Sequence, residues 1–186
     1  TISEVPVTRW NCRALPAASE AVETRRRHGG YVLNAQCFAN GAFGVSTAEA
    51  GAMDPQQRLL LERGYEALHA GQLDRTALND SLTGVFVGVT FLAFEEDLRS
   101  SPAGSTVYAA TGSALSVCSG RLSFTFGMHG PCLSIDTACS AALAAGHSAL
   151  TAMRRDDCGG ALAMGVNLML SPTVSARFAL AGMTSP

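Results

Sequence analysis

The stretch that decides the fold is PCLSIDTACSAALAA, residues 131–145. Its first part, residues 131–135, is short, apolar and rich in β-forming side chains, which predicts a buried strand. Its last part, residues 141–145, contains only alanine and leucine and is the best helix-forming run in the chain. The five residues between them, DTACS (136–140), are therefore expected to form a strand-to-helix turn.

Cys139 lies where this turn becomes a helix, and that position suits a nucleophile. The N-terminus of a helix carries a partial positive charge, which favours the thiolate over the thiol. The alternative is an inert structural cysteine, because free cysteines are among the most buried residues in proteins. The strand-turn-helix setting favours the first interpretation, so we predict that Cys139 is a catalytic nucleophile.

The segment DTACSAALAAGHSAL (136–150) resembles the nucleophile segment of β-ketoacyl synthases, the condensing domains of polyketide and fatty acid synthases. The resemblance covers nearly the whole chain, is weakest between residues 12 and 28, and keeps the family's order and spacing. Further matching segments are EVPVTRW (4–10), MDPQQRLLLERGYEAL (53–68), TGVFVGVT (83–90), the run 108–140, and ALAMGVNLMLSP (161–172). Several long motifs in register are more specific than any short pattern.

The resemblance implies an α/β, thiolase-like fold, layered α/β/α, in which two similar βαβαβ halves pack together. We expect residues 1–186 to be a partial ketosynthase domain that begins after the family's first strand and holds the nucleophile-bearing half. Within it, residues 1–50 read as a loop-rich opening segment, and residues 51–186 as the nucleophile-bearing α/β half.

The activity implied by the resemblance is that of an acyltransferase. Cys139 would hold an acyl group taken from a thioester, and a malonyl-type extender on an acyl carrier protein would condense with it after losing CO₂. In the family, the backbone N–H of the nucleophile is one oxyanion-hole donor, and two histidines and a lysine complete the site from the other half. Two alternatives stay open: a non-elongating domain that only relays acyl chains, and a non-catalytic partner subunit that shapes the pocket.

None of the four histidines in this chain is expected to act on Cys139. His147 is eight residues further along the same helix, or about 12 Å along its axis, so we interpret it as a packed or capping residue. His129 is expected in a turn at the far end of the nucleophile strand. His28 and His69 are expected to be exposed.

Composition excludes several classes of function. The chain has 47% hydrophobic and 15% charged residues and a formal net charge of −2, which argues against a nucleic-acid binder. No apolar run is long enough to span a bilayer, and no targeting segment is visible, so we expect the cytoplasm or the stroma of an organelle. The six cysteines lack disulfide or Cys-x-x-Cys spacing, so neither disulfides nor a metal site is expected.

The expected partners are an acyl carrier protein, the remainder of the ketosynthase domain and, since the family is usually homodimeric, a second copy. The resemblance implies no cofactor bound by the domain itself, because the phosphopantetheine arm arrives on the carrier protein. The basic run Arg25-Arg26-Arg27 is interpreted as a solvated loop, with docking to an acidic carrier as the alternative.

Strands alternating with helices predict a mostly parallel sheet covered on both faces. Asp54 is expected to cap a helix that starts at Pro55, with Gln57 closing a capping box, a stripe of Leu61, Tyr65 and Leu68, and an end at Gly71. The remaining elements are expected as follows: buried strands over 83–90 and 161–170, a loop region over 91–106, and helices over 113–124 and 139–155, the last with Leu143, Gly146, Leu150 and Met153 on one face.

Asp136, Thr137 and Arg121 are given structural roles: the first two fix the turn, and Arg121 needs a carboxylate partner because it lies in an apolar segment. The sequence departs from the family pattern at Met164, where glycine is usual, and at Tyr65, where tryptophan is usual.

Overall fold

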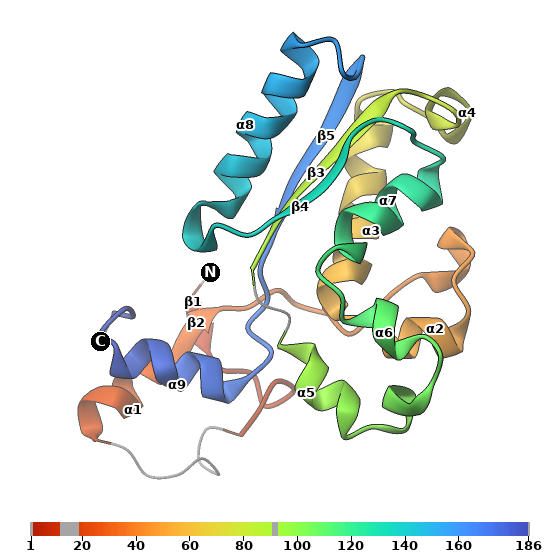
Figure 1. Ribbon diagram of the computed structural model, residues 1–186. Coiled ribbons are helices and arrows are strands. Elements are labelled where there is room, and N and C mark those ends of the chain that lie inside the picture. The colour runs from red at the N-terminus through yellow and green to blue at the C-terminus, as the bar shows by residue number, and fades with distance from the viewer. Residues whose placement is uncertain (1, 12–18, 91–92, 186) are drawn as a thin grey trace. The chain divides into compact units, whose positions relative to one another are not determined.

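The computed structural model describes residues 2–11, 19–90 and 93–185 (Figure 1). The chain forms two compact units, residues 35–167 and residues 1–34 with 168–186. The division at residue 50 stays a prediction.

The larger unit is built on a parallel sheet of the strands β4 (Cys132–Ile135), β3 (Thr83–Val89) and β5 (Gly160–Val166), in the order β4-β3-β5. Strand β3 lies between the other two, and its Val85 pairs with Cys132 on one side and Leu162 on the other. All of β3 after Thr83 is buried. The parallel sheet and the buried strand expected over 83–90 are therefore confirmed.

Helices cover both faces of this sheet. Helix α8 (Ala141–Arg154) packs on one face against all three strands, while α3 (Pro55–Ala70) and α7 (Val117–Phe126) lie on the other (Figure 1). Each side has its own core: mainly leucine, valine and methionine toward α3 and α7, and small residues around Phe86 toward α8. This is the expected layered α/β/α arrangement.

The two outer strands are less buried than expected. Cys132 and Leu133 of β4 are exposed, and so are Ala163 and Gly165 of β5. In the described sheet each of these strands has one neighbour instead of two, so their apolar sequences do not bury them. Strand β5 also ends at Val166, four residues before the expected end.

Helix α3 begins and ends where the sequence predicts. The Asp54 carboxylate accepts a hydrogen bond from the Gln56 N–H (2.7 Å), Pro55 occupies the first turn, and Gly71 is the C-cap. The expected capping box is wrong, because the Gln57 amide donates instead to the Thr111 carbonyl 3.0 Å away. Of the predicted stripe, Leu61 and Leu68 are buried, whereas Tyr65 is 41% exposed.

The loop expected over 91–106 is wrong for its described part, which contains helix α5 (Phe94–Arg99) and the short 3₁₀ turn η3 (Pro102–Ser105). Acidic residues fill the first turn of α5, and Arg99 in its last turn pairs with Glu95 at 2.6 Å, an arrangement that suits the helix dipole. The helix expected over 113–124 is α7, which is preceded by the short helix α6 (Ala109–Gly112). The other helical elements of this unit are η2 (Asn40–Phe43), α2 (Thr47–Ala52) and α4 (Arg75–Leu78).

In the smaller unit, β1 (Ile2–Glu4) pairs antiparallel with β2 (His28–Gly30), and α1 (Glu20–Arg26) packs on α9 (Pro172–Leu180). The expected solvated loop is wrong for Arg26, which ends helix α1, is buried and forms an ion pair with Glu23 one turn earlier. That pairing leaves the run less available for a carrier than its sequence indicates.

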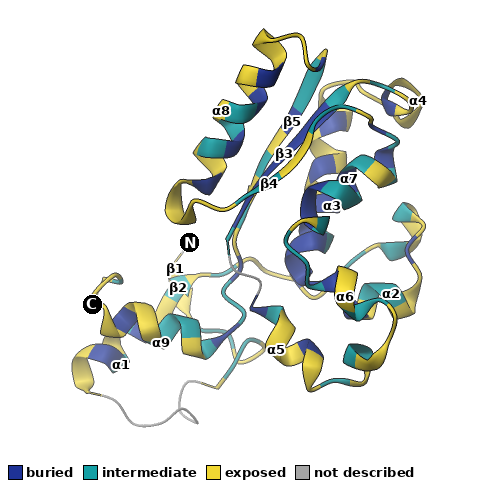
Figure 2. Ribbon diagram, in the orientation of Figure 1, coloured by how far each residue is buried: buried dark blue, intermediate teal, exposed yellow. Residues whose placement is uncertain are grey.

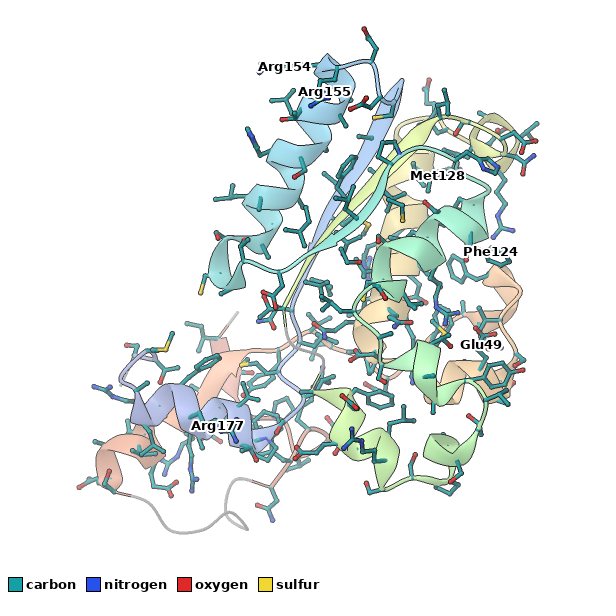
Figure 3. All side chains as sticks on the ribbon, in the orientation of Figure 1. Glu49, Phe124, Met128, Arg154, Arg155 and Arg177 are labelled. Carbon is teal, nitrogen blue, oxygen red and sulfur yellow. The ribbon has the colours of Figure 1, made fainter. Side chains whose placement is uncertain are left out.

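Helix α8 has two unlike faces (Figure 2). Its buried side consists of four alanines, Ala141, Ala145, Ala149 and Ala152, and small side chains let the helix lie close to the sheet. The expected shared face of larger residues is the outward one, where Leu143 is 80% exposed, Leu150 46% and Met153 43%. Arg154 and Arg155 lie at the end of the helix (Figure 3), where cations complement the dipole.

Candidate active site

The candidate site is the turn between β4 and α8, called the elbow below and defined as residues 136–140. Strand β4 ends at Ile135, the 3₁₀ turn η4 (Ala138–Ser140) follows, and α8 begins at Ala141. The helix thus begins two residues later than the sequence predicts. Cys139 lies in η4 and is exposed, as a nucleophile must be.

Ala138 gives the elbow its sharp bend. Its φ of +54° lies in the left-handed region, where a non-glycine residue costs about 1–3 kcal/mol. The Asp136 carboxylate offsets part of this cost by accepting a 2.9 Å hydrogen bond from the Ala138 N–H. The Ser140 hydroxyl closes the turn by donating to the Thr137 carbonyl at 2.8 Å. The expected turn-fixing roles of Asp136 and Thr137 are confirmed.

Two glycines bring the start of α8 down onto the sheet. A β-carbon added to Gly88 in β3 would lie 2.5 Å from the Ala141 carbonyl carbon, and one added to Gly165 in β5 would lie 2.7 Å from the Ala142 β-carbon. These contacts are shorter than van der Waals distance, so the first turn of α8 fits only above strands that lack side chains at these positions. The elbow position therefore depends on all three strands and the helix.

The Cys139 backbone N–H is available to a ligand. Among the described residues, no acceptor engages this N–H, since the turn and helix hydrogen bonds begin with the amides of Ser140 and Ala141. A free N–H and a thiol therefore belong to the same exposed residue. This pair can supply a nucleophile and a hydrogen-bond donor to one carbonyl group.

The histidines do not approach Cys139. Within the described part of the chain, no hydrogen bond or ion pair joins a histidine to this residue. His147 is exposed on α8, so its expected packed or capping role is wrong. His129 lies 3.2 Å from Asp80, in the turn that precedes β4, as expected. His28 and His69 are exposed, also as expected.

Arg121 has the carboxylate partner that its sequence context demands. Its guanidinium lies 2.5 Å from Glu49 of α2 (labelled in Figure 3) and donates to the Gln57 side chain at 3.1 Å. These contacts join α7 to α2 and α3, so the residue is structural, as predicted.

Two buried ionisable groups lie near this ion pair, and sequence reasoning gave neither its buried state. Burial raises the pKa of Asp54 from its ordinary value of 3.8 to about 6. Burial, together with the charge of Asp54, raises the pKa of the Cys118 thiol to about 12. Cys118 is therefore unsuited to nucleophilic chemistry near neutral pH.

Five cysteines lie in the described part of the chain, and all are free: Cys37, Cys132 and Cys139 are exposed, whereas Cys118 and Cys158 are buried. Exposure alone does not single out Cys139; its place at the start of α8 does. Among the described residues, no group of three or more His, Cys, Asp or Glu side chains could hold a metal ion. None of the described helices is long and apolar enough to cross a membrane.

Met164 is directed away from α8. Its side chain packs with the core on the α3 face, and its sulfur would lie 3.4 Å from a β-carbon added to Gly64 of α3. The departure from glycine at position 164 is therefore accommodated by a glycine on the facing helix, and it changes the packing of α3 rather than the elbow.

The architecture defines a class first: a layered α/β protein of the thiolase-like fold, with an exposed cysteine at the turn between a parallel strand and a helix. The family model for the β-ketoacyl synthase N-terminal domain matches residues 1–186. The chain therefore belongs to the β-ketoacyl synthase family, and its relatives identify it as a polyketide synthase ketosynthase.

Two curated relatives are modular synthases of Streptomyces. The chain is 44% identical over 184 residues to polyketide synthase GfsB of Streptomyces halstedii, which covers 97% of this chain and 3% of that protein. It is 42% identical over 180 residues to the pikromycin polyketide synthase component PikAII of Streptomyces venezuelae, covering 95% of this chain and 5% of that protein. The chain thus spans a small fraction of the relatives it matches.

Solved ketosynthases share the fold. The oxazolomycin ketosynthase domain OzmH KS7 of Streptomyces albus JA3453 superposes with a TM-score of 0.82 at 32% identity, covering 97% of this chain and 32% of that one. The ketosynthase from module 6 of the bacillaene synthase of Bacillus subtilis 168 has the same TM-score at 26% identity, with coverage of 97% and 29%. The chain corresponds to about a third of each structure.

Proposed function

We propose that this chain is the nucleophile-bearing half of a ketosynthase domain that catalyses decarboxylative Claisen condensation, with Cys139 as the nucleophile. The observation that carries the proposal is the exposed Cys139 at the start of α8, with its own N–H unengaged among the described residues, in a chain of this family. The natural polypeptide that carries these residues is called the parent polypeptide below.

The first half-reaction is acyl transfer. The Cys139 thiolate attacks the carbonyl carbon of an acyl thioester, a carbon–sulfur bond forms, and the carrier's phosphopantetheine thiolate leaves and takes up a proton. Negative charge develops on the carbonyl oxygen in the transition state, and the Cys139 N–H is placed to donate to that oxygen. One donor of this kind contributes roughly 3–4 kcal/mol to a reaction barrier.

The second half-reaction forms the carbon–carbon bond. A malonyl-type extender on an acyl carrier protein loses CO₂, and the electron pair of the broken bond becomes an enolate. The enolate carbon attacks the acyl group on Cys139, the carbon–sulfur bond to the enzyme breaks, and a β-ketoacyl thioester remains on the carrier. The histidines and the lysine for this step would come from outside this chain.

Three further proposals concern the setting of the reaction. The carrier protein delivers phosphopantetheine as part of the substrate, and the chain itself binds no cofactor. The domain acts as a homodimer, as its family usually does. The reaction takes place in the cytoplasm, where the modular synthases that resemble this chain would meet their carriers.

Acyl loading tests the nucleophile. The parent polypeptide is incubated with an acyl thioester and followed by intact-mass analysis, with Cys139→Ala as the variant and Cys37→Ala as the matched exposed control. We expect one acyl group on the natural protein and on the Cys37→Ala control, and none on Cys139→Ala. Full loading of Cys139→Ala would move the nucleophile elsewhere.

A second measurement separates condensation from relay. The acyl-loaded parent polypeptide is given a malonyl-type extender on a carrier protein, and both CO₂ release and the β-ketoacyl product are followed. We expect both to appear. Acyl loading without either would favour the non-elongating relay, and the absence of loading would favour the non-catalytic partner subunit.

A further inference from the structure

The peptide group between Ala138 and Cys139 is held at one end and open at the other. Its carbonyl oxygen accepts from the Ala141 N–H and from the Thr90 hydroxyl, the latter at 3.4 Å. Its N–H, which belongs to Cys139, meets no acceptor among the described residues. In a trans peptide the carbonyl and the N–H point in opposite directions, so what holds the carbonyl also aims the N–H.

We propose that Thr90 is a positioning residue, which aims the Cys139 N–H at the thioester oxygen by holding the Ala138 carbonyl. The inference rests on the proposed function, in which that N–H stabilises the developing oxyanion. Thr90 does not itself touch the substrate in this account. It acts through the peptide group that it binds.

Thr90 is anchored well enough for this role. It directly follows β3, which is buried from Gly84 to Val89 and paired on both sides. Gly88 of that strand pairs with Ile135, the last residue of β4, so Thr90 is carried alongside the elbow. A hydroxyl on the most restrained strand of the sheet is thereby directed at the least restrained peptide of the turn.

The elbow needs such a restraint because Ala138 is left-handed. The Asp136 carboxylate holds the Ala138 N–H, which lies before the strained residue, whereas Thr90 holds the carbonyl that follows it. A rotation of the following peptide would turn the Cys139 N–H away from the thiol without breaking the Asp136 contact. The hydrogen bond from Thr90 opposes this rotation.

Thr90 also makes the N–H a stronger donor. A carbonyl that accepts hydrogen bonds polarises its own amide, which increases the positive charge on the amide hydrogen. The 3.4 Å separation is long for an O–H···O bond, and contacts of this kind commonly shorten when the substrate binds. Both effects act in the transition state of acyl transfer, where the oxyanion is present.

The test compares two reactions of the same thiol in the parent polypeptide. Acylation by an acyl thioester passes through an oxyanion, whereas alkylation by iodoacetamide attacks a saturated carbon and forms none. Thr90→Val removes the hydroxyl with almost no change in shape, and Thr90→Ser keeps it. We expect Thr90→Val to slow single-turnover acylation about tenfold, with alkylation unchanged within about twofold, and Thr90→Ser to acylate like the natural protein.

Three outcomes would overturn the role of Thr90: natural acylation in Thr90→Val, equal slowing of acylation and alkylation, or a Thr90→Ser variant as slow as Thr90→Val. Equal slowing would assign Thr90 to the general integrity of the elbow. A natural protein that is alkylated at Cys139 but never acylated would overturn the proposed function, and the role of Thr90 with it.

Discussion

Gly88 lies directly beneath Ala141: a β-carbon on the strand residue would be 2.5 Å from the carbonyl carbon of the helix residue. The neighbouring atoms are backbone, which cannot rotate away as a side chain can. The position of α8, and with it that of Cys139, is therefore coupled to the absence of one methyl group in β3.

We expect Gly88→Ala to lower both stability and acyl loading, because the start of α8 must move away from the sheet. Overpacking of this kind costs about 1–3 kcal/mol. Thermal unfolding and the loading rate of the parent polypeptide measure the two effects. Gly51→Ala is the matched control, since it lies in α2 with no atom near the added carbon, and we expect it to be neutral or stabilising. Unimpaired loading by Gly88→Ala would show that the elbow tolerates a shift of α8.

The cysteines are expected to differ in reactivity. With limiting iodoacetamide near neutral pH, we expect Cys139 to be alkylated first, because its place at the start of α8 favours the thiolate. Cys118 should remain unmodified, because it is buried and its pKa of about 12 leaves almost no thiolate. The exposed Cys37 and Cys132 control for access. Peptide mass spectrometry reports each site, and equal labelling of Cys118, Cys132 and Cys139 would contradict the assignment.

Asp54 is expected to make stability depend on pH. Burial raises its pKa to about 6 in the folded chain, from 3.8, so the folded state holds the proton more tightly than the unfolded state does. Its contribution to stability is therefore complete below pH 4 and is lost as the pH rises toward and above 6. The loss is on the order of 3 kcal/mol at most.

Asp54→Asn tests this dependence, because asparagine caps a helix as well as aspartate but does not ionise. Denaturant unfolding of the parent polypeptide between pH 4 and 8 should show the variant gaining on the natural protein as the pH rises. The control is Asp156→Asn, an exposed residue whose φ of +59° asparagine tolerates, and it should show no such trend. Parallel stability curves for Asp54→Asn and the natural protein would contradict the prediction.

Gly64 and Met164 are expected to be coupled. A β-carbon on Gly64 would lie 2.9 Å from the Leu122 side chain and 3.4 Å from the Met164 sulfur. We expect Gly64→Ala to cost about 1–3 kcal/mol and Met164→Ala to cost about 2 kcal/mol. The double variant should cost less than the sum, since removing Met164 lets Leu122 move away. Strict additivity in denaturant unfolding would show that the two sites are independent.

The outward face of α8 is expected to need a covering partner. Leu143, Leu150 and Met153 are exposed together on one helix, and apolar surfaces of this kind promote association. We therefore expect residues 1–186, expressed alone, to aggregate or associate, and co-expression of the following segment of the parent polypeptide to restore solubility. Size measurement and thermal unfolding decide this. A soluble monomer with one cooperative transition would contradict the expectation that the second half covers this face.

Much of the fold follows from local sequence. The apolar run 83–90 gave β3, the Asp54-Pro55 pair gave the start of α3, and the alanine-rich run after Cys139 gave α8. These features depend on residues that are close in the chain, so propensity, periodicity and capping are enough to predict them. The nucleophile was named for the same reason, because a strand, a turn and a helix in succession are visible in fifteen residues.

Tertiary structure decided what lies at the sheet edges and which distant residues meet. The apolar sequences of β4 and β5 could not show that each has one neighbouring strand in the described sheet, and the sequence of α8 could not show that its alanines, not its leucines, face the sheet. Likewise, Gln57 meets Thr111, and Thr90 meets Ala138, across separations of 54 and 48 residues. A local pattern carries no information on such pairings, because they arise only when strands and helices pack. The sequence by itself therefore identified the cysteine, and the packing of β3 against the elbow determined how its thiol and its N–H are presented.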